Sequence, residues 1–453
     1  MPVRPRAGSR TERALVSGVL VAVALFALAA LVAHLPGIDV HAGSAAPLLA
    51  AWGPRVGVGT APALALVWWS TTQHPWRATS TMGWGRLLTS VWALSLTWML
   101  SLALIDGVAG VGGVLTHDSE YLVTARGVDD VGELLRSFVS RIPLSPNDHW
   151  PVHVAGHPPG ALLFFVGLVR LGLGSGLSAG LVVCIVAATT PVAVAVTCRA
   201  LGAEARVRSV LPLLAIGPFA LWQAVSADAV FAAVAAWSIA LVALAATASR
   251  RSVAFGLAAA AGLALGGCVM LSYGLPLVGA VAVAVLAAVG GWRADLLRLA
   301  AAIAAAVTCV VLGFALAGFA YWDAYPVLHQ RYWDGLASAR PAAYWVWANL
   351  ALLAVCAGPL LFGSLAVAGR RLVLSVRRPQ DDPALTLVAG AFLAVLVADL
   401  SLMSKAEVER IWLPFVPWLL LSAVVLPVRW RRTALFVQAG LALLVQSLLV
   451  TPW

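Results

Sequence analysis

Residues 227–271 decide the fold class of this chain. They read ADAVFAAVAAWSIALVALAATA over 227–248, SRRS over 249–252 and VAFGLAAAAGLALGGCVML over 253–271. A membrane-spanning helix needs about 20 apolar residues, and both long runs approach or exceed that length. The arginines between them form a short basic turn of the kind that stays on the cytoplasmic side of a membrane. The stretch therefore predicts a helical hairpin that crosses a membrane twice.

The remainder of the chain has the same character. Of its 453 residues, 62% are hydrophobic and only 11% are charged, whereas roughly 25% are charged in soluble domains. This composition excludes a soluble enzyme, a disordered protein and a secreted disulfide scaffold. The net charge of +10 comes from short basic clusters between apolar runs, so it indicates membrane topology and not a nucleic-acid partner. We expect an all-α polytopic membrane protein, with residues 1–453 as one integral membrane domain.

About 13 transmembrane helices are predicted from the apolar runs. The runs at 57–72 and 209–223 are the shortest. The predicted spans are 14–35, 57–72, 87–106, 178–198, 209–223, 227–248, 253–271, 275–291, 297–320, 342–368, 384–403, 411–428 and 433–450.

The positions of the arginines determine the topology. Arg4, Arg6, Arg10 and Arg13 precede the first run, which we interpret as an uncleaved helix with a cytoplasmic N-terminus. If 159–174 crossed the membrane, most later basic clusters would face outside, against the positive-inside rule. We therefore predict that 159–174 is an interfacial or re-entrant helix on the outer side. The preceding stretch, about 108–158, is then a large extracytoplasmic loop.

This first outer loop carries acidic and histidine side chains. Val128 to Val139 has the apolar spacing of an amphipathic helix on the membrane surface, and its acids suit the first turns of that helix. Asp118 and Glu120 follow the third span directly, where partial desolvation raises the pKa of a carboxyl and makes it a better proton acceptor. A solvated loop acid is the alternative.

Three histidines in the same loop, His149, His153 and His157, are spaced by four residues. That spacing could place metal ligands on one helix face. However, Pro151 and Pro158 argue against a regular helix there. We predict a polar lining for a substrate cleft or interfacial packing, and no metal or other cofactor.

Two later outer segments combine aromatic and basic side chains. In 321–341, Tyr321, Trp322, Tyr325, Tyr332 and Trp333 suit either a membrane-interface belt or stacking on a sugar. Arg331 and Arg340 in that segment are candidate phosphate ligands. In SLMSKAEVERIWLPF, Lys405 and Arg410 lie near Glu407 and Glu409. Charges at a membrane edge are costly unless they are paired or bind a ligand. Lys405 and Arg410 are therefore expected either to pair with the two glutamates or to bind a phosphate.

Together these residues resemble the C-type glycosyltransferases (GT-C), polytopic enzymes that use polyprenyl-phosphate sugars at the outer membrane face. The family's outer-loop acid matches Asp118 in THDSEYL, although the usual DE or DD pair is here split by Ser119. Its HPP tripeptide matches His157, Pro158 and Pro159 in GHPPGALLFF. Two further features that fit the family are Arg199, Arg206 and Arg208, and the stretch Ser226–Asp228.

More narrowly, YWVWANL and KAEVERIWLPF look like actinobacterial membrane proteins of the methylthioxylose-transferase type. That resemblance implies a plasma-membrane enzyme with an extracytoplasmic active site. Its partners would be a polyprenyl-phosphate sugar donor, a cell-envelope glycan or lipoglycan acceptor, and membrane lipid.

The mechanism expected from this resemblance is a single, inverting displacement. The catalytic candidates are Asp118 and Glu120; one of them takes the proton of an acceptor hydroxyl while the anomeric carbon gains oxocarbenium character. The donor-phosphate candidates are Lys405, Arg410, Arg331 and Arg340. The substrate-binding candidates are His157, Tyr121, Trp333 and Glu409. The alternative is a transporter or flippase of a lipid-linked or small polar substrate, which would use intramembrane charges such as Asp228 and Asp399.

Overall fold

The structure is a computed structural model that describes residues 7–73, 75–290 and 294–452. It is 75% helical, and its two short strands pair antiparallel, Ala51 with Val450 and Trp52 with Leu449. Arg4 and Arg6 lie outside the described residues. The all-α class predicted from the sequence is therefore confirmed.

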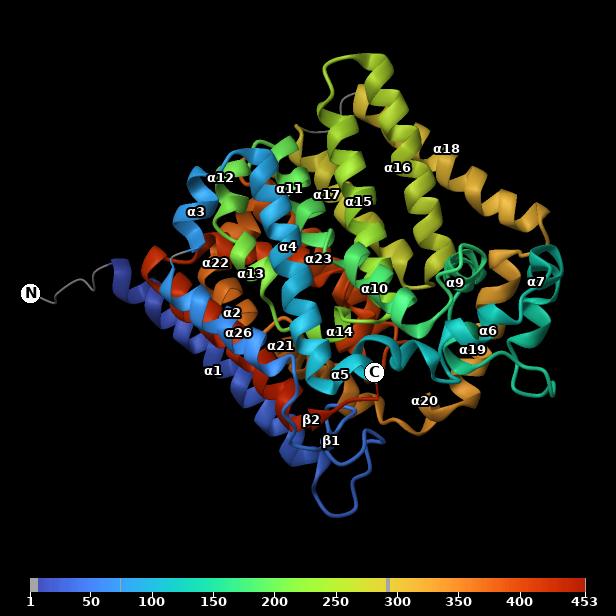
Figure 1. The fold of residues 1–453 in the computed structure, drawn as a ribbon. Helices are drawn as coiled ribbons and strands as arrows, with labels where there is room; N and C mark the ends of the chain where they lie inside the picture. Colours follow the sequence, from blue (N-terminus) through green and yellow to red (C-terminus); the bar gives the residue numbers. More distant parts are fainter. Residues whose placement is uncertain (1–6, 74, 291–293, 453) are drawn as a thin grey trace, which may run out of the picture.

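The elements follow one another along the chain and are arranged as in Figure 1. In order they are α1 (Ala7–Ala33), β1 (Ala51–Trp52), α2 (Thr60–Thr72), α3 (Pro75–Thr81), α4 (Trp84–Ala103), η1 (Leu104–Asp106), α5 (Gly107–Gly112), η2 (Val114–Thr116), α6 (Tyr121–Arg126), α7 (Val131–Ser137), η3 (Val139–Arg141), α8 (Val152–Ala155), α9 (Pro159–Arg170), α10 (Gly176–Ala187), α11 (Thr190–Ala200), α12 (Glu204–Arg208), α13 (Leu211–Ala215), α14 (Ala220–Gln223), α15 (Ala227–Thr247), α16 (Arg251–Leu271), η4 (Leu275–Val278), α17 (Gly279–Ala288), α18 (Ala294–Leu316), α19 (Tyr321–Asp334), α20 (Leu336–Ala339), α21 (Ala342–Cys356), α22 (Leu360–Arg377), α23 (Pro383–Leu400), α24 (Val408–Ile411), α25 (Val416–Leu419), η5 (Leu420–Val425), α26 (Val428–Leu448) and β2 (Leu449–Val450).

Seven helices among the described residues are long and apolar enough to cross a membrane, and a bent pair raises the number to eight. The seven are Arg10–Ala33, Trp84–Thr116, Gly176–Ala200, Ala227–Thr247, Arg251–Leu271, Ala294–Leu316 and Pro383–Leu400. A multi-pass membrane protein is thus supported, whereas the count of about 13 spans is not confirmed.

Several predicted spans are broken where prolines interrupt them. The run 342–368 is split into α21 and α22, which meet at 104° across Gly358 and Pro359. Pro212 and Pro218 lie in the run 209–223, which forms only the short helices α13 and α14. The run 411–428 likewise forms α25 and η5 in place of one helix. Proline cannot donate a backbone hydrogen bond and clashes with the preceding turn, so hydropathy alone overestimates helix length here.

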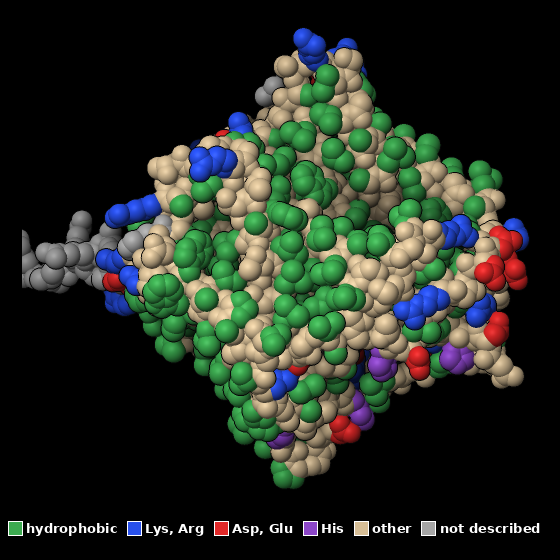
Figure 2. Space-filling view, viewed as in Figure 1, with side chains coloured by type: hydrophobic (Ala, Val, Ile, Leu, Met, Phe, Trp, Pro, Cys, Tyr) green, Lys and Arg blue, Asp and Glu red, His purple; other side chains and the backbone are tan. Residues whose placement is uncertain are grey.

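One end of the helix bundle collects basic side chains, and we call it the arginine end. Ion pairs there join α12 to the start of α23 (Arg206–Asp382) and α26 to α1 (Arg429–Glu12, 2.6 Å). The turn between α15 and α16 carries Arg250 at this same end, at the top of Figure 1. On the face seen in Figure 2, hydrophobic side chains are spread over the whole surface, and most charged ones lie toward its edges. This distribution is what a membrane-embedded bundle requires.

The opposite end, which we call the loop end, carries residues 104–158 and the helices α19, α20 and α24. Helix α9 begins and finishes there. At its first turn, Gly160 lies against the backbone of Met270 at the end of α16, and at its last turn Arg170 donates to the carbonyl of Asp129, 3.1 Å away. At 12 residues, α9 is also shorter than the helices that are long enough to span a membrane. Its interfacial position stays a prediction.

The helix expected over Val128–Val139 is shorter and more buried than predicted. It spans Val131–Ser137, and Asp130 caps it by accepting hydrogen bonds from Gly132 N and Glu133 N. Its apolar side packs inward, because Phe138 is fully buried against Trp150 and Phe319. The apolar face therefore belongs to the protein core and does not lie on a membrane surface.

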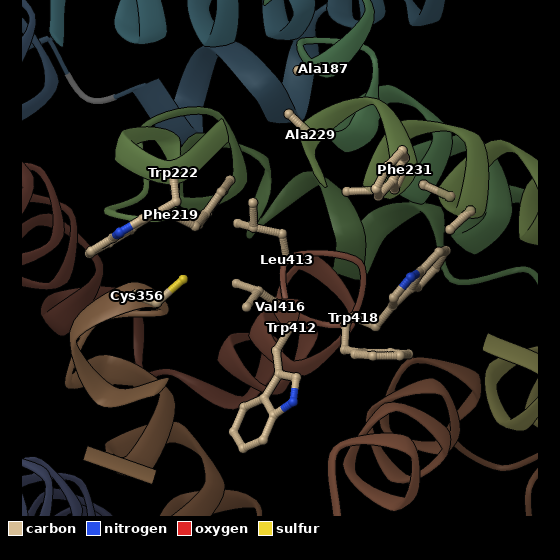
Figure 3. Packing of buried hydrophobic residues seen from close by; sticks show 14 of the residues in the cluster. Ala187, Phe219, Trp222, Ala229, Phe231, Cys356, Trp412, Leu413, Val416 and Trp418 are labelled. Carbon is tan, nitrogen blue, oxygen red and sulfur yellow. The ribbon is translucent and has the colours of Figure 1, made fainter. Parts of the chain in front are cut away.

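The segment after α23 is inserted in the middle of the molecule. Trp412, Leu413, Val416 and Trp418 are buried there, surrounded by side chains of α14, α15 and α21 (Figure 3). Burial of large aromatic side chains dominates the packing energy of such a core. This packing fixes the position of Arg410, two residues before Trp412.

Candidate functional site

Charged and polar side chains from four distant segments meet at the loop end. Glu120 immediately precedes α6, His153 lies in α8, Asp228 lies in the first turn of α15, and Arg410 lies in α24. Glu120, Asp228 and Arg410 are each at most 7% exposed. Buried charges are expensive unless they are paired, so this arrangement points to a functional cluster. We call these four residues the acid–base cluster.

Glu120 has cationic or hydrogen-bonding neighbours on one of its oxygens. Its Oε1 lies 2.9 Å from His153 Nδ1 and 3.8 Å from Arg410 Nη1. Burial raises the pKa of Glu120, but the hydrogen bond from His153 and the charge of Arg410 outweigh burial and leave that pKa below its ordinary value. Glu120 is thus ionised at neutral pH.

Asp228 and Arg410 form the shortest charged pair of the cluster. Arg410 donates from Nε to Asp228 Oδ2 at 2.9 Å, and Nη2 lies 2.8 Å from the same oxygen. Ser226 caps α15 by accepting from Ala229 N, and an acid in a helix's first turn is stabilised by the helix dipole. Burial lowers the pKa of Arg410, but Asp228 and Glu120 more than compensate and raise it above its ordinary value, so Arg410 keeps its charge.

His157 and Tyr121 extend this cluster on its apolar side. The Tyr121 hydroxyl lies 2.7 Å from His157 Nδ1, and that nitrogen also lies 2.9 Å from the His153 carbonyl oxygen. Burial lowers the pKa of His157, so its imidazole is neutral at neutral pH. The Tyr121 ring stacks on Phe165 of α9, with ring centroids 5.4 Å apart. The HPP segment is therefore anchored to α6 through this pair.

A pocket opens beside the cluster with a volume of about 160 Å³. Sites for drug-sized ligands usually measure roughly 300–1,000 Å³, so this pocket accommodates a small polar group and not a whole lipid-linked substrate. Its polar lining consists of His153, His157, Asp228, Ser272, Glu407 and Arg410.

A second charged group borders the pocket through Glu407. Arg340 donates from Nη2 to Glu407 Oε1 at 2.9 Å and from Nη1 to the Lys405 carbonyl at 2.8 Å. Lys405 Nζ in turn donates to the Arg340 carbonyl and lies 4.3 Å from the centre of the Trp333 ring. Burial and the neighbouring charge of Arg340 lower the pKa of Lys405. The structure thus brings together the predicted residues Lys405, Arg340 and Trp333.

Arg331 and Glu409 lie outside both groups. Arg331 donates to the carbonyl oxygens of Ile142 and Trp150, so its guanidinium holds the loop between η3 and α8 against α19. Glu409 is 1% exposed, and neither the pocket lining nor the ion pairs of the described residues include it. These two predicted site residues are therefore placed where they support the backbone or the core.

Asp118 and Glu120 differ sharply in environment, which the sequence left open. Asp118 is exposed at the end of the turn after η2, whereas Glu120 is buried against Arg410. From the sequence, His153 is expected to line a cleft or to pack at the interface. Asp228 belongs to the stretch Ser226–Asp228 that fits the family and is otherwise an intramembrane charge for a transporter. Neither residue is a predicted site residue. The sequence gives only weak indications that these two residues belong to the site. Asp228 lies two residues after Ser226 at the start of a span, and His153 precedes the HPP tripeptide by four residues.

No family model, curated protein or solved structure matches this chain.

Proposed function

We propose that this protein is a membrane glycosyltransferase that moves a sugar from a polyprenyl-phosphate donor to a cell-envelope glycan or lipoglycan. The observation that carries the proposal is the acid–base cluster: two buried carboxylates, an arginine and a histidine beside a small polar pocket in an otherwise apolar bundle. Structural stability does not require such a cluster, because replacing buried ion pairs by apolar residues is often neutral or stabilising.

The pocket provides the groups that such a transfer needs. The carboxylates of the acid–base cluster promote removal of the proton from the acceptor hydroxyl. Arg410 compensates the negative charge that develops on the departing phosphate. The acceptor oxygen bonds to the anomeric carbon as the bond from that carbon to the phosphate oxygen breaks, and the electron pair leaves with the polyprenyl phosphate. The phosphate is a good leaving group, so a general acid is not needed. One displacement inverts the anomeric centre.

We further propose a membrane topology and a donor sugar. The chain crosses the plasma membrane about 13 times with a cytoplasmic N-terminus, and the loop end faces outward. The donor's lipid lies along the apolar helices, and its phosphate binds to Arg410. Lys405 and Arg340 lie on the other side of Glu407 from Arg410. The proposed donor sugar is methylthioxylose, on the strength of the resemblance in YWVWANL and KAEVERIWLPF.

The decisive experiment compares Glu120→Gln with Asp118→Asn in purified protein given a radiolabelled polyprenyl-phosphate sugar. We expect Glu120→Gln to lower the transfer rate by about 10²–10⁴-fold, because it removes a buried charge that pairs with Arg410. Asp118→Asn is the matched control and should retain near-wild-type activity, because Asp118 is exposed.

The opposite ranking of the two variants would reject the assignment of Glu120. Substrate movement across vesicle membranes without bond formation would favour the transporter alternative.

A further inference from the structure

His153 separates Glu120 from the pocket. The Nδ1 atom of His153 is buried and lies 2.9 Å from Glu120 Oε1. The His153 side chain is nevertheless 18% exposed, so its exposed part belongs to the remainder of the ring, which lines the pocket. Glu120 itself is absent from that lining, and its side chain is 5% exposed.

A carboxylate at one ring nitrogen determines what the other nitrogen can do. When Nδ1–H donates to a carboxylate, the tautomer is fixed and the Nε2 lone pair is left as the proton acceptor, as in Ser-His-Asp enzymes. The carboxylate then stabilises the imidazolium that forms. The low pKa of Glu120 is consistent with a permanently charged partner.

We propose that His153, and not Glu120, accepts the acceptor's proton, and that Glu120 is a positioning residue behind it. This proposal deepens the proposed function and rests on it. In the reaction, the hydroxyl proton moves to His153 Nε2 as the acceptor oxygen bonds to the anomeric carbon, and the electron pair of the broken bond leaves with the phosphate. The imidazolium afterwards returns its proton to water.

The surroundings of His153 determine its charge state during the cycle. Glu120 and Asp228 are the carboxylates that interact with this group of histidines, while Arg410 and His157 are the cationic or neutral neighbours. Glu407 lines the same pocket. Replacing Glu120 removes the carboxylate nearest to the ring, so an imidazolium formed at His153 loses the counter-charge that stabilises it.

The first test does not depend on transferase activity. Diethyl pyrocarbonate modifies unprotonated imidazole, and mass spectrometry locates each modified histidine. We expect His153 to be modified, with a pH midpoint that falls by at least one unit in Glu120→Gln and is unchanged in Asp118→Asn. The exposed His149 serves as an internal control whose midpoint stays constant. If His153 is unreactive, or if its pH midpoint is the same in Glu120→Gln as in the wild type, the pairing of His153 with Glu120 is overturned.

The second test measures transfer by His153→Gln, with His149→Gln as control. We expect kcat to fall by about 10²–10⁴-fold, with KM for the donor within about threefold, and the low-pH limb of the wild-type rate profile to disappear. Retained kcat and an unchanged pH profile would refute His153 as the base. If wild-type protein transfers no sugar while the modification result holds, then the proposed function fails and the histidine–carboxylate pair stands.

Discussion

Glu409 and Arg410 are neighbours in the chain, yet they meet different electrostatic environments. The guanidinium of Arg410 lies between Asp228 and Glu120. Glu409 Oε2 is buried without a hydrogen-bond partner among the described residues. Burial raises the pKa of Glu409 to about 7. One residue thus keeps its charge at neutral pH, and the other is at the margin of losing it.

Glu409 should make the stability of the protein depend on pH. Its folded-state pKa of about 7 lies above the ordinary value of 4.5, so the folded state binds more protons than the unfolded state between these values. The free energy of unfolding therefore falls as pH rises through this window and levels off above it. Glu409→Gln should raise stability at pH 8 by about 2–3 kcal/mol and flatten the profile.

Thermal unfolding of detergent-solubilised protein at pH 5 and pH 8 measures this effect. Glu133→Gln is the control, because Glu133 is exposed on α7 and its replacement should leave the profile unchanged. Parallel profiles for wild type and Glu409→Gln would contradict the prediction.

Asn349 holds the turn that carries Lys405 and Glu407. Its Nδ2 donates to Asp399 Oδ1 at 2.8 Å and to the Ser404 carbonyl at 2.7 Å, and its Oδ1 accepts from Ala406 N at 3.3 Å. Ala406 and Glu407 have φ of 69° and 61°, a left-handed conformation that costs about 1–3 kcal/mol per residue. The buried amide therefore maintains a strained turn at the edge of the pocket.

Replacing Asn349 should be strongly destabilising. Asn349→Leu leaves three buried polar groups without this partner, each at a cost of about 1–3 kcal/mol, so we expect a large fall in Tm and reduced yield of folded protein. Asn147 is exposed, and Asn147→Leu is the control. Equal Tm values for the two variants would show that Asn349 does not hold this turn.

At the scale of elements, close helix packing depends on particular glycines. A Cβ atom at Gly262 of α16 would clash with the Ile303 carbonyl oxygen and would lie 2.6 Å from the Ala306 Cβ on α18. At Gly267 of the same helix, a Cβ atom would have nothing within 4 Å. Small residues let transmembrane helices approach closely where water provides no driving force. The two glycines thus have different roles despite similar sequence surroundings.

This difference predicts the effect of matched substitutions in α16. Gly262→Leu should force α16 and α18 apart and lower Tm by several degrees, whereas Gly267→Leu should leave Tm nearly unchanged. Cysteine cross-linking between the two helices, measured with each variant, reports their separation directly. Equal behaviour of the variants would refute this packing contact.

At the scale of the whole molecule, the basic clusters and the acid–base cluster lie at opposite ends of the bundle. Arg206, Arg251 and Arg429 pair at the arginine end, whereas Glu120 and Arg410 lie at the loop end. Under the positive-inside rule, this arrangement would place the candidate site outside the cell, as we propose. Labelling can test this sidedness.

We expect a cysteine at position 145 to react with an impermeant maleimide in intact cells, and one at position 249 to react only after lysis. Ser145 is exposed in the loop between η3 and α8, and Ser249 is exposed in the α15–α16 turn. The exposed native cysteine, Cys309, is first replaced by alanine. Labelling of both positions from the same side would reject the topology and the proposed outward site.

Composition and charge by themselves determined the helical, membrane-embedded class, because apolar runs of this length have no other stable solution in a lipid bilayer. The sequence also located much of the candidate site, since Glu120, His157 and Arg410 stand out as polar groups beside apolar runs. It overestimated continuous helices in 209–223 and 342–368, where local prolines outweigh hydropathy.

Only the tertiary structure decided which acid belongs to the site and what it contacts. Asp118 and Glu120 are two residues apart and look equivalent in the sequence, yet packing buries one and exposes the other. The acid–base cluster forms through contacts between residues that are far apart in the sequence. Glu120 and Arg410, for example, are 290 positions apart. Periodicity and composition describe local preference, and they carry no information on which distant charges will compensate one another inside a low-dielectric core.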